Sequence, residues 1–336
     1  QDAMFSYAKL TYELGRSPFN EAITSFQQYI DAYPEAKNIE DAYAYLVKVY
    51  MSTRNYKDAL AWLDKIKKRD HEINKAYQKI SYYRGLEYFN NLEYDKAIDM
   101  FNAAIKNDVY DKNITALSYF WRGDAKYRLD KFEDAIDDYK LFVTSTGAIG
   151  KDEYPLAHYN LGYAYFKLKK YDDAAIWFRT YVEFKNIAKT KTYADACNRA
   201  GDCCFMQKKY DLAIKFYDLA YSANNLDYDY ALFQKSFCMG IQRKYDQKID
   251  GMLKLLNDYP QSSLIDDATF EIAETYCIKE QHEKAIPYYE TIVRKHPSSS
   301  YGKRSLLQLG LIYYNLNQTD KSLSVYQKIV ADYKGT

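Results

Sequence analysis

Residues 158–178 read HYNLGYAYFKLKKYDDAAIWF, and this stretch decides the fold. It places Gly162 in its first half and Ala174 in its second half, with aromatic residues at Tyr165, Tyr171 and Phe178. Large apolar residues at this spacing indicate two amphipathic helices. We expect the glycine and the alanine to lie where the two helices press backbone to backbone, with the aromatic rings filling the space between layers.

The same frame recurs along the whole chain. The position of Ala174 is repeated every 35 to 39 residues, at Ala22, Ala59, Ala97, Ala135, Ala174, Ala213, Lys248, Ala285 and Ser322. Such a period is typical of stacked helix pairs, because one pair is too small to bury its apolar face alone. We therefore expect a single solenoid over residues 1–336, with nine units at about 3–34, 41–70, 76–108, 115–146, 154–186, 193–225, 229–260, 266–297 and 302–333.

This frame resembles the tetratricopeptide-repeat family, whose signature is W-x2-L-G-x2-Y followed by A-x3-F and a later proline such as Pro297. In residues 158–178 only the opening aromatic differs, since His158 stands in its place. The resemblance implies an all-α fold, a right-handed α-solenoid superhelix of about nine helix-turn-helix units with very little strand. Such repeats serve many protein assemblies, so the resemblance identifies the fold more sharply than the function.

Two connections carry a narrower resemblance. The stretches from Asp258 to Ser263 and from His296 to Tyr301 look like linkers of bacterial envelope repeat proteins. The Lys/Asn/Tyr/Ile-rich style is similar to that of multi-repeat proteins of the Bacteroidetes. This resemblance implies the bacterial cell envelope, in the periplasm or associated with the outer membrane. The odd count of five cysteines favours a reducing cytoplasm instead, and both compartments stay open.

The composition excludes several classes of function. Tyrosine is abundant, with 39 of 336 residues, whereas glycine (12) and proline (6) are too scarce for a β-sandwich or a nucleotide-binding phosphate loop. The 47 Lys and Arg residues balance 46 Asp and Glu residues, which gives no electrostatic reason to expect nucleic acid as a partner. No uninterrupted apolar run approaches the roughly 18 residues of a transmembrane helix, so we expect no direct membrane insertion.

The sequence carries no signature of catalysis or of metal binding. The four histidines fall in four different units, and Cys197, Cys203 and Cys204 form no CxxC pair. The two glycines of the connection 144–153 are interpreted as part of a flexible linker rather than as a phosphate cradle. We therefore expect no catalytic residues, no metal and no cofactor, and we do not expect an enzyme.

Binding is predicted along one face of the first helix of each unit. In tetratricopeptide arrays these helices line the concave surface, and their exposed positions fall six and three residues before the Gly/Ala position and one and four residues after it. Exposed aromatic patches usually mark interaction sites. The predicted partner-binding residues are Tyr82, Phe89, Phe120, Tyr127, Tyr159, Tyr163, Phe166, Phe205, Phe233 and Phe237. The alternative is that these rings pack on one another across the groove.

A peptide clamp known in the family is incomplete here. Some relatives grip a C-terminal carboxylate with Lys, Asn and Arg side chains from three consecutive units. Asn160 is in place and Arg199 follows one unit later, but the partner positions hold other residues, namely Phe120, Asp124, Asp195 and Asp202. An aromatic stripe therefore suits an apolar, Pro-rich or helical segment better than a chain terminus.

These observations favour a non-enzymatic scaffold that binds partner proteins or peptide segments in an aromatic concave groove. Two alternatives stay open: a structural spacer in a longer repeat array, and a ligand-binding or enzymatic pocket inside the superhelix. Both ends of the chain look cut, so we expect a segment of a longer protein. The last helix carries apolar residues such as Leu323 and Tyr326, which makes self-association through uncapped ends a further alternative.

Overall fold

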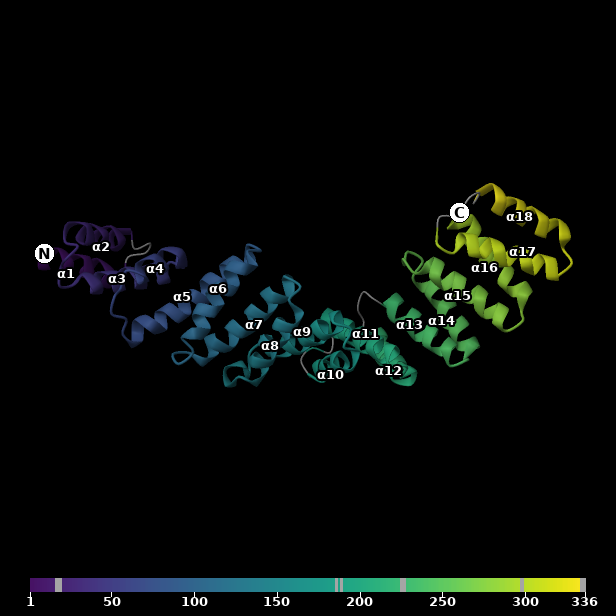
Figure 1. Cartoon of the computed structure of the whole chain (residues 1–336), viewed down its shortest axis with the longest axis horizontal. Helices are drawn as coiled ribbons and strands as arrows, with labels where there is room; N and C mark the ends of the chain where they lie inside the picture. The colour runs from purple at the N-terminus through teal and green to yellow at the C-terminus, as the bar shows by residue number, and fades with distance from the viewer. Residues whose placement is uncertain (16–19, 185–186, 188–189, 224–227, 297–298, 333–336) are drawn as a thin grey trace. The chain divides into compact units, whose positions relative to one another are not determined.

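The structure is a computed structural model that describes residues 1–15, 20–184, 187, 190–223, 228–296 and 299–332. Within these residues the chain forms eighteen α-helices, one short 3-10 helix and no strand, which confirms the predicted all-α class. The helices group into two compact parts, the N-terminal body (Gln1–Lys169) and the C-terminal body (Lys170–Thr336), each drawn in Figure 1. The predicted unit ends at positions 186, 225, 297 and 333 lie outside the described residues, as does Pro297.

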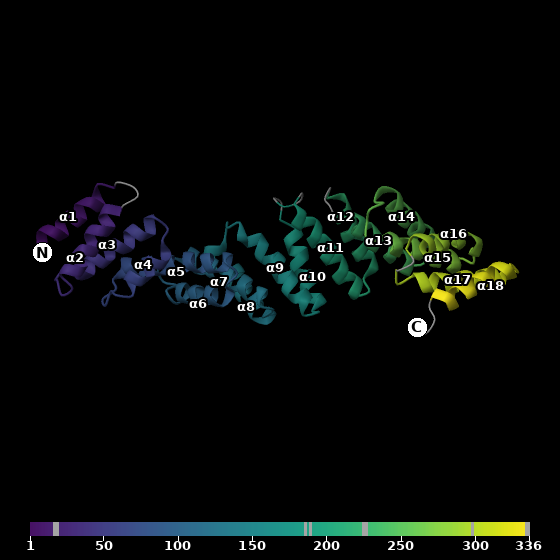
Figure 2. The same ribbon diagram turned by 90° about the horizontal axis from the view of Figure 1, so that it is seen from above.

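The N-terminal body consists of nine α-helices and the 3-10 helix, within the described residues. They are α1 (Asp2–Glu13), α2 (Asn20–Ala32), α3 (Ile39–Ser52), α4 (Tyr56–Leu63), α5 (His71–Asn90), α6 (Tyr94–Lys106), α7 (Lys112–Arg128), α8 (Phe132–Thr144), η1 (Thr146–Ala148) and α9 (Glu153–Lys167). Consecutive helices contact one another in chain order, and α5 to α8 lie side by side in Figure 2.

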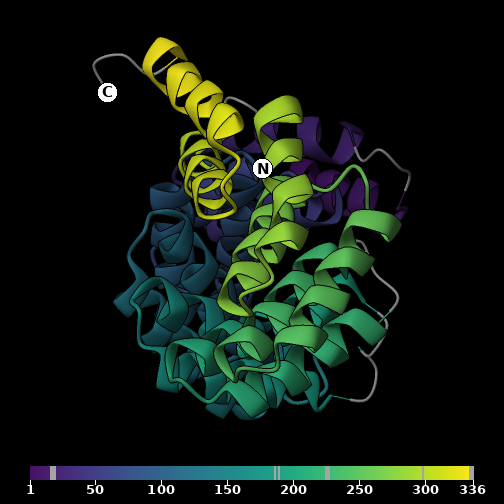
Figure 3. The ribbon, with the colours of Figure 1, turned by 90° about the vertical axis from the view of Figure 1, so that its right-hand side faces the viewer.

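The C-terminal body contains the remaining described helices. They are α10 (Tyr171–Val182), α11 (Lys191–Met206), α12 (Tyr210–Ser222), α13 (Tyr228–Ile241), α14 (Tyr245–Asp258), α15 (Ile265–Ile278), α16 (His282–Lys295), α17 (Gly302–Asn315) and α18 (Thr319–Asp332). Here too each helix packs on its neighbours in the sequence, as the green and yellow helices of Figure 3 show.

The tight turns that end the first helices share one backbone form. One residue of each turn has a positive φ angle, between 56° and 63°, although none of these residues is glycine: Arg54, Leu92, Asp130, Lys169, Lys208, Arg243, Glu280 and Asn317. In the turn after α3, the N–H of Asn55 donates to the carbonyl of Tyr50 at 2.8 Å and the N–H of Arg54 donates to that of Met51 at 3.2 Å. These are the two bonds of a Schellman motif, which satisfies the last carbonyls of a helix.

Several first helices place a glycine against an aromatic ring of the second helix. A Cβ atom on Gly85 would lie 2.6 Å from Cε1 of Phe101, and one on Gly201 would lie 2.6 Å from Cε1 of Tyr217. The predicted backbone-to-backbone contact is therefore wrong. The ring fills the space that the glycine leaves. It belongs to the residue four positions after the repeated alanine of the second helix. Phe101 and Tyr217 are consequently buried in the cores of their helix pairs.

The connection between α8 and α9 is packed rather than flexible, so the prediction of a flexible linker is wrong. Gly147 and Ala148 of η1 are buried against α7. A Cβ atom on Gly147 would lie 2.2 Å from the carbonyl oxygen of Lys112, so only glycine fits this contact. This packing fixes where α9 begins, and with it the positions of Asp152 and Glu153.

Candidate functional site

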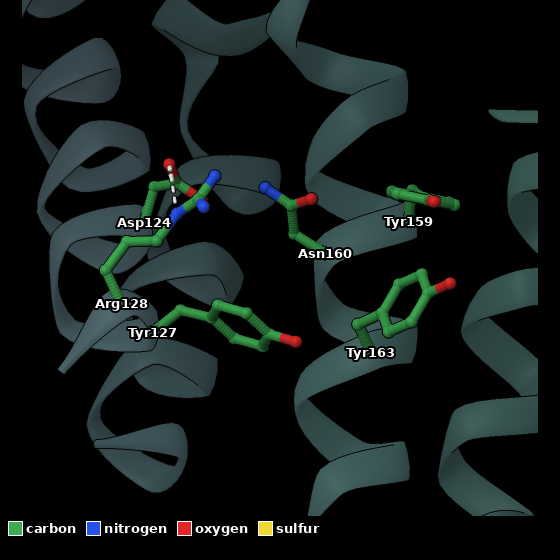
Figure 4. Close-up of a pocket in the computed structure, with 6 residues that line it drawn as sticks. All are labelled: Asp124, Tyr127, Arg128, Tyr159, Asn160 and Tyr163. Atoms are coloured by element: carbon green, nitrogen blue, oxygen red, sulfur yellow. Dashed lines mark ion pairs between the residues drawn. The ribbon is translucent and has the colours of Figure 1, made fainter. Parts of the chain in front are cut away.

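Two adjoining cavities lie along α7 and α9 of the N-terminal body. The first has a volume of about 200 Å³, and Figure 4 shows the residues that line it: Asp124, Tyr127, Arg128, Tyr159, Asn160 and Tyr163. The second has a volume of about 400 Å³ and shares four of these residues. Its further lining consists of Phe89, Phe120, Trp121, Asp152, Glu153 and Leu156. We call the two cavities together the α7–α9 groove.

A chain of hydrogen bonds crosses the floor of this groove. The Asn160 amide donates to the hydroxyl of Tyr139 at 3.3 Å, and that hydroxyl donates to Oδ1 of Asp124 at 3.2 Å. The Nε atom of Arg128 lies 3.9 Å from the other carboxylate oxygen of Asp124, as the dashed line in Figure 4 marks. The groove therefore contains an ordered polar centre, with Arg128 at its exposed edge and the buried ring of Tyr139 beneath it.

Burial sets the electrostatic character of the polar centre. It raises the pKa of Asp124 above its ordinary value, although the Arg128 charge and the Tyr139 hydroxyl act in the opposite direction. Burial also raises the pKa of Tyr127, so this phenol stays neutral and able to donate a hydrogen bond at neutral pH. The centre thus offers one carboxylate, one guanidinium, one amide and several phenols.

The pairing of Tyr139 with Asp124 is repeated elsewhere in the chain. In the C-terminal body the hydroxyl of Tyr217 donates to Asp202 at 2.8 Å, and that of Tyr289 donates to Glu274 at 2.5 Å. Each acid directly follows the Gly/Ala position of its first helix, and each tyrosine provides the ring that packs on that position. A buried phenol needs such an acceptor, so part of each acid's role is structural.

Aromatic rings form the walls of the α7–α9 groove. The rings of Phe89 and Trp121 meet edge to face with their centroids 5.2 Å apart, and Tyr159 and Tyr163 do the same at 4.9 Å. All four rings are half-buried, so each presents part of its surface to the groove. A surface of this composition offers large apolar contact area together with hydrogen-bonding groups.

The structure brings together only part of the predicted stripe. Phe89, Phe120, Tyr127, Tyr159 and Tyr163 line the groove, and all but Phe120 are half-buried. The remaining half-buried members are Phe166, Phe205, Phe233 and Phe237. In the C-terminal body the rings of this set stack on one another, with centroids 6.1 to 6.2 Å apart. Part of the stripe therefore lines a cavity, and another part packs ring against ring.

The expectation that Tyr82 and Phe120 face solvent is wrong. They are 6% and 4% exposed, and their rings pack 6.2 Å from Phe101 and 6.0 Å from Tyr139. Each residue precedes its glycine by three positions and so shares the glycine's face of the helix, which points at the ring of the second helix. The position three before the Gly/Ala position therefore belongs partly to the core.

The corresponding surface of α11, in the C-terminal body, holds an arginine of the chain itself. Nη1 of Arg199 lies 2.5 Å from Asp202, and its Nε lies 3.7 Å from Asp195. The guanidinium carbon of Arg199 lies 5.2 Å from the centre of the Tyr230 ring, and the Tyr230 hydroxyl donates to Asp202 at 2.8 Å. Two of the residues that break the carboxylate clamp, Asp195 and Asp202, thus form a cation site that Arg199 already occupies.

Several groove residues were not predicted as site residues. The sequence places Asp124 on the stripe, one residue after Gly123, but does not mark it as a binding residue, and it does not single out Trp121, Arg128, Asp152 or Glu153. Trp121 and Arg128 lie next to or between stripe positions, and the two acids depend on the packing of η1. A signal for Asp124 does exist in the sequence: an acid directly after the glycine, with tyrosine rather than phenylalanine sixteen residues after the glycine.

Comparison with known proteins agrees with the helix pairs. A family model described as tetratricopeptide repeat matches residues 82–148 and 122–189, and a second model of the same description matches residues 304–336. These segments are tetratricopeptide repeats, which confirms the resemblance. No curated protein sequence matches the chain. The repeats are an architecture for binding proteins or peptides, so they support a role in protein interaction.

One solved structure shows the same fold, and others are similar over part of the chain. The C-terminal part of a TPR repeat-containing protein from Cytophaga hutchinsonii is similar with a TM-score of 0.60 at 17% identity, over 76% of this chain and 96% of that chain. YrrB, described as a TPR protein with an unusual peptide-binding site, has a TM-score of 0.48 at 19% identity, over 61% and 96%. MamA from Desulfovibrio magneticus RS-1 has a TM-score of 0.46 at 17% identity, over 55% and 97%.

Two searches of the described residues bear on other functions. No helix among them is long and apolar enough to cross a membrane. No group of three or more His, Cys, Asp or Glu side chains is arranged there to hold a metal ion.

Proposed function

We propose that the chain is a non-enzymatic scaffold that binds a segment of a partner protein in the α7–α9 groove. The observation that carries this proposal is the groove itself, in which aromatic walls surround an ordered polar centre. Tyr127, Tyr159 and Tyr163 supply rigid contact area at a small loss of conformational entropy. The Asn160 amide carries both donors and an acceptor, the complement of a peptide group.

The shape of the groove favours a peptide over a small molecule. Its two cavities are open and continuous along neighbouring first helices, and they share Asp124, Arg128, Tyr159 and Asn160. An extended or helical segment can cover both cavities at once, whereas a small ligand would fill only one of them. The bacterial cell envelope stays the predicted compartment for this interaction.

Site-specific photo-crosslinking tests the proposal in the native cells. We expect p-benzoylphenylalanine at position 163, inside the groove, to crosslink to one defined partner segment. The same residue at position 109, where Val109 is 72% exposed outside the groove, is the matched control and should not crosslink to that segment. A synthetic peptide of the crosslinked segment then allows the affinity to be measured directly.

Alanine substitutions complete the test. Tyr159→Ala, Tyr163→Ala and Phe166→Ala together should weaken binding of this peptide by at least about a hundredfold, since a few aromatic anchors usually carry most of an interface's binding energy. Far-UV circular dichroism should stay helical. Unchanged affinity in a folded triple variant, or equal crosslinking at positions 109 and 163, would show that the groove is not the binding site. A spacer role would then be favoured.

A further inference from the structure

The charges that line the α7–α9 groove are unbalanced. The lining contains three acids, Asp124, Asp152 and Glu153, against one base, Arg128, which leaves two negative charges in excess. Asp152 and Glu153 form no ion pair with any described residue. They line the same cavity as the aromatic rings of Phe89, Trp121 and Tyr159.

Another cavity of the N-terminal body has the opposite balance. It lies between α3 and α5, and its lining contains Arg54 and Lys79 against the single acid Glu87. Glu87 is moreover paired with Arg84 at 2.6 Å. The negative excess is therefore a local property of the α7–α9 groove and does not follow from the charge of the whole chain, which is close to neutral.

The helix macrodipole does not account for both acids. An acid in the first turn of a helix is favourable because the N-terminus carries about half a positive charge. Asp152 and Glu153 together bring two full negative charges to the start of α9, so a negative field remains after this compensation. A cation near aromatic faces gains from both the field and the ring quadrupoles, and tryptophan is the strongest of the ring partners.

The chain itself shows how such a surface holds a guanidinium group. In the C-terminal body Arg199 is paired with Asp202 and lies over the ring of Tyr230. Asp202 follows Gly201 just as Asp124 follows Gly123, so the two acids occupy the same position of the repeat. Arg199 lies two residues before Gly201, and this position holds Trp121 in α7 and Asn160 in α9, so neither helix supplies a built-in cation at this place.

We propose that the α7–α9 groove selects a partner segment that carries an arginine or lysine side chain, which enters between the aromatic walls and the acids Asp152 and Glu153. This rests on the proposed function and adds the chemistry of the bound residue. A guanidinium group fits better than an ammonium group, because its planar form can stack on an aromatic face and pair with a carboxylate at once.

A peptide series tests this selectivity on the full chain. Octapeptides with an identical apolar host sequence carry arginine, lysine, citrulline or glutamate at one central position, and their affinities are measured by isothermal titration calorimetry. Citrulline has the shape of arginine without its charge. We expect the arginine peptide to bind about tenfold more tightly than the citrulline peptide, because a partly desolvated cation–π contact and ion pair contribute about that much. The glutamate peptide should bind most weakly.

The double variant Asp152→Asn/Glu153→Gln should reduce the preference for arginine over citrulline to within about twofold, by removing the attracting charges. The matched control is Glu133→Gln/Asp134→Asn, which removes two first-turn acids of α8, both exposed and outside the groove lining. It should leave the preference intact. Equal binding of the arginine and citrulline peptides, or an arginine preference that survives in the double variant, would overturn this inference while the groove assignment stands. Failure of all four peptides to bind would count against both proposals.

Discussion

The first helices α7 and α11 use the same repeat positions in opposite ways. In both, an acid follows the glycine and accepts a hydrogen bond from the tyrosine that packs on that glycine. In α11 the acid Asp202 is also held by Arg199 and Tyr230, and the surface is filled by the chain itself. In α7 the charged partner of Asp124 is Arg128, which is more distant and more exposed than Arg199 is in α11. A cavity lies beside Asp124. Repeat position alone therefore does not decide whether this surface contains a cavity; the neighbouring side chains do.

The largest expected difference between the two surfaces is in stability. Asp202→Ala should lower the free energy of unfolding by about 3–5 kcal/mol, because it leaves Arg199 without its nearest partner in a largely buried network. Asp124→Ala should cost only about 1–3 kcal/mol, since it removes the acceptor of the buried Tyr139 hydroxyl while Arg128 can turn to water. Urea unfolding of both variants and the parent measures the two values.

Hydrogen exchange localises the two effects. Loss of protection in the Asp202→Ala variant should fall on α11 to α13, which contain Asp202, Arg199 and Tyr230, and that in the Asp124→Ala variant on α7 to α9. If the two substitutions had equal effects on stability, the contrast between a filled and an open surface would be wrong.

The second difference is in the pH dependence of binding. Burial raises the pKa of Asp124, so this carboxyl takes up a proton at a higher pH than an ordinary aspartate does. When the pH falls through that raised pKa, the groove loses one negative charge. The affinity for the arginine octapeptide should then fall by about two- to fivefold, the value of a partly exposed charge contact, while that for the citrulline peptide stays nearly constant.

The variant Asp124→Asn isolates the contribution of Asp124 to this pH dependence. The amide can still accept the Tyr139 hydrogen bond but does not titrate, so the variant should lose the step caused by Asp124 and bind the arginine peptide with the weaker affinity throughout. An unaltered pH profile in this variant would show that Asp124 does not contribute to the attraction of cations.

The sequence predicts the scaffold better than the site for a physical reason. Helix pairs follow from the periodic placement of residues such as Gly162, Ala174 and Phe178, and this pattern acts over a few turns of one or two helices. The groove depends on contacts between repeats. Whether the ring of Phe120 points at the core or at solvent depends on the second helix of its pair. The places of Asp152 and Glu153 depend on the packing of η1 on α7.

The sequence pattern nevertheless predicts some of the residues that line the groove. The stripe rule correctly placed Tyr127, Tyr159 and Tyr163 on one surface, because residues at i, i+4 and related spacings share a helix face. It did not distinguish the stretch that lines a cavity from the stretch around Phe205 and Phe237, where rings of neighbouring first helices contact one another. That distinction depends on the side chains of two neighbouring first helices together, which a rule for one helix does not include.

The smallest expected effect tests whether the scaffold itself is equivalent in the two bodies. Leu92, after α5, and Lys208, after α11, occupy the same turn position with φ angles of 63° and 61°. A left-handed conformation costs a residue with a Cβ atom about 1–2 kcal/mol, whereas glycine adopts it freely but loses about 0.5–1 kcal/mol more in conformational freedom on folding. Leu92→Gly and Lys208→Gly should therefore each stabilise the chain by about 0.5 kcal/mol. Urea unfolding measures both changes in the free energy of unfolding. Similar increases in both variants would limit the difference between the bodies to the surfaces of α7 and α11. An increase in one variant and a decrease in the other would show that the scaffolds differ as well.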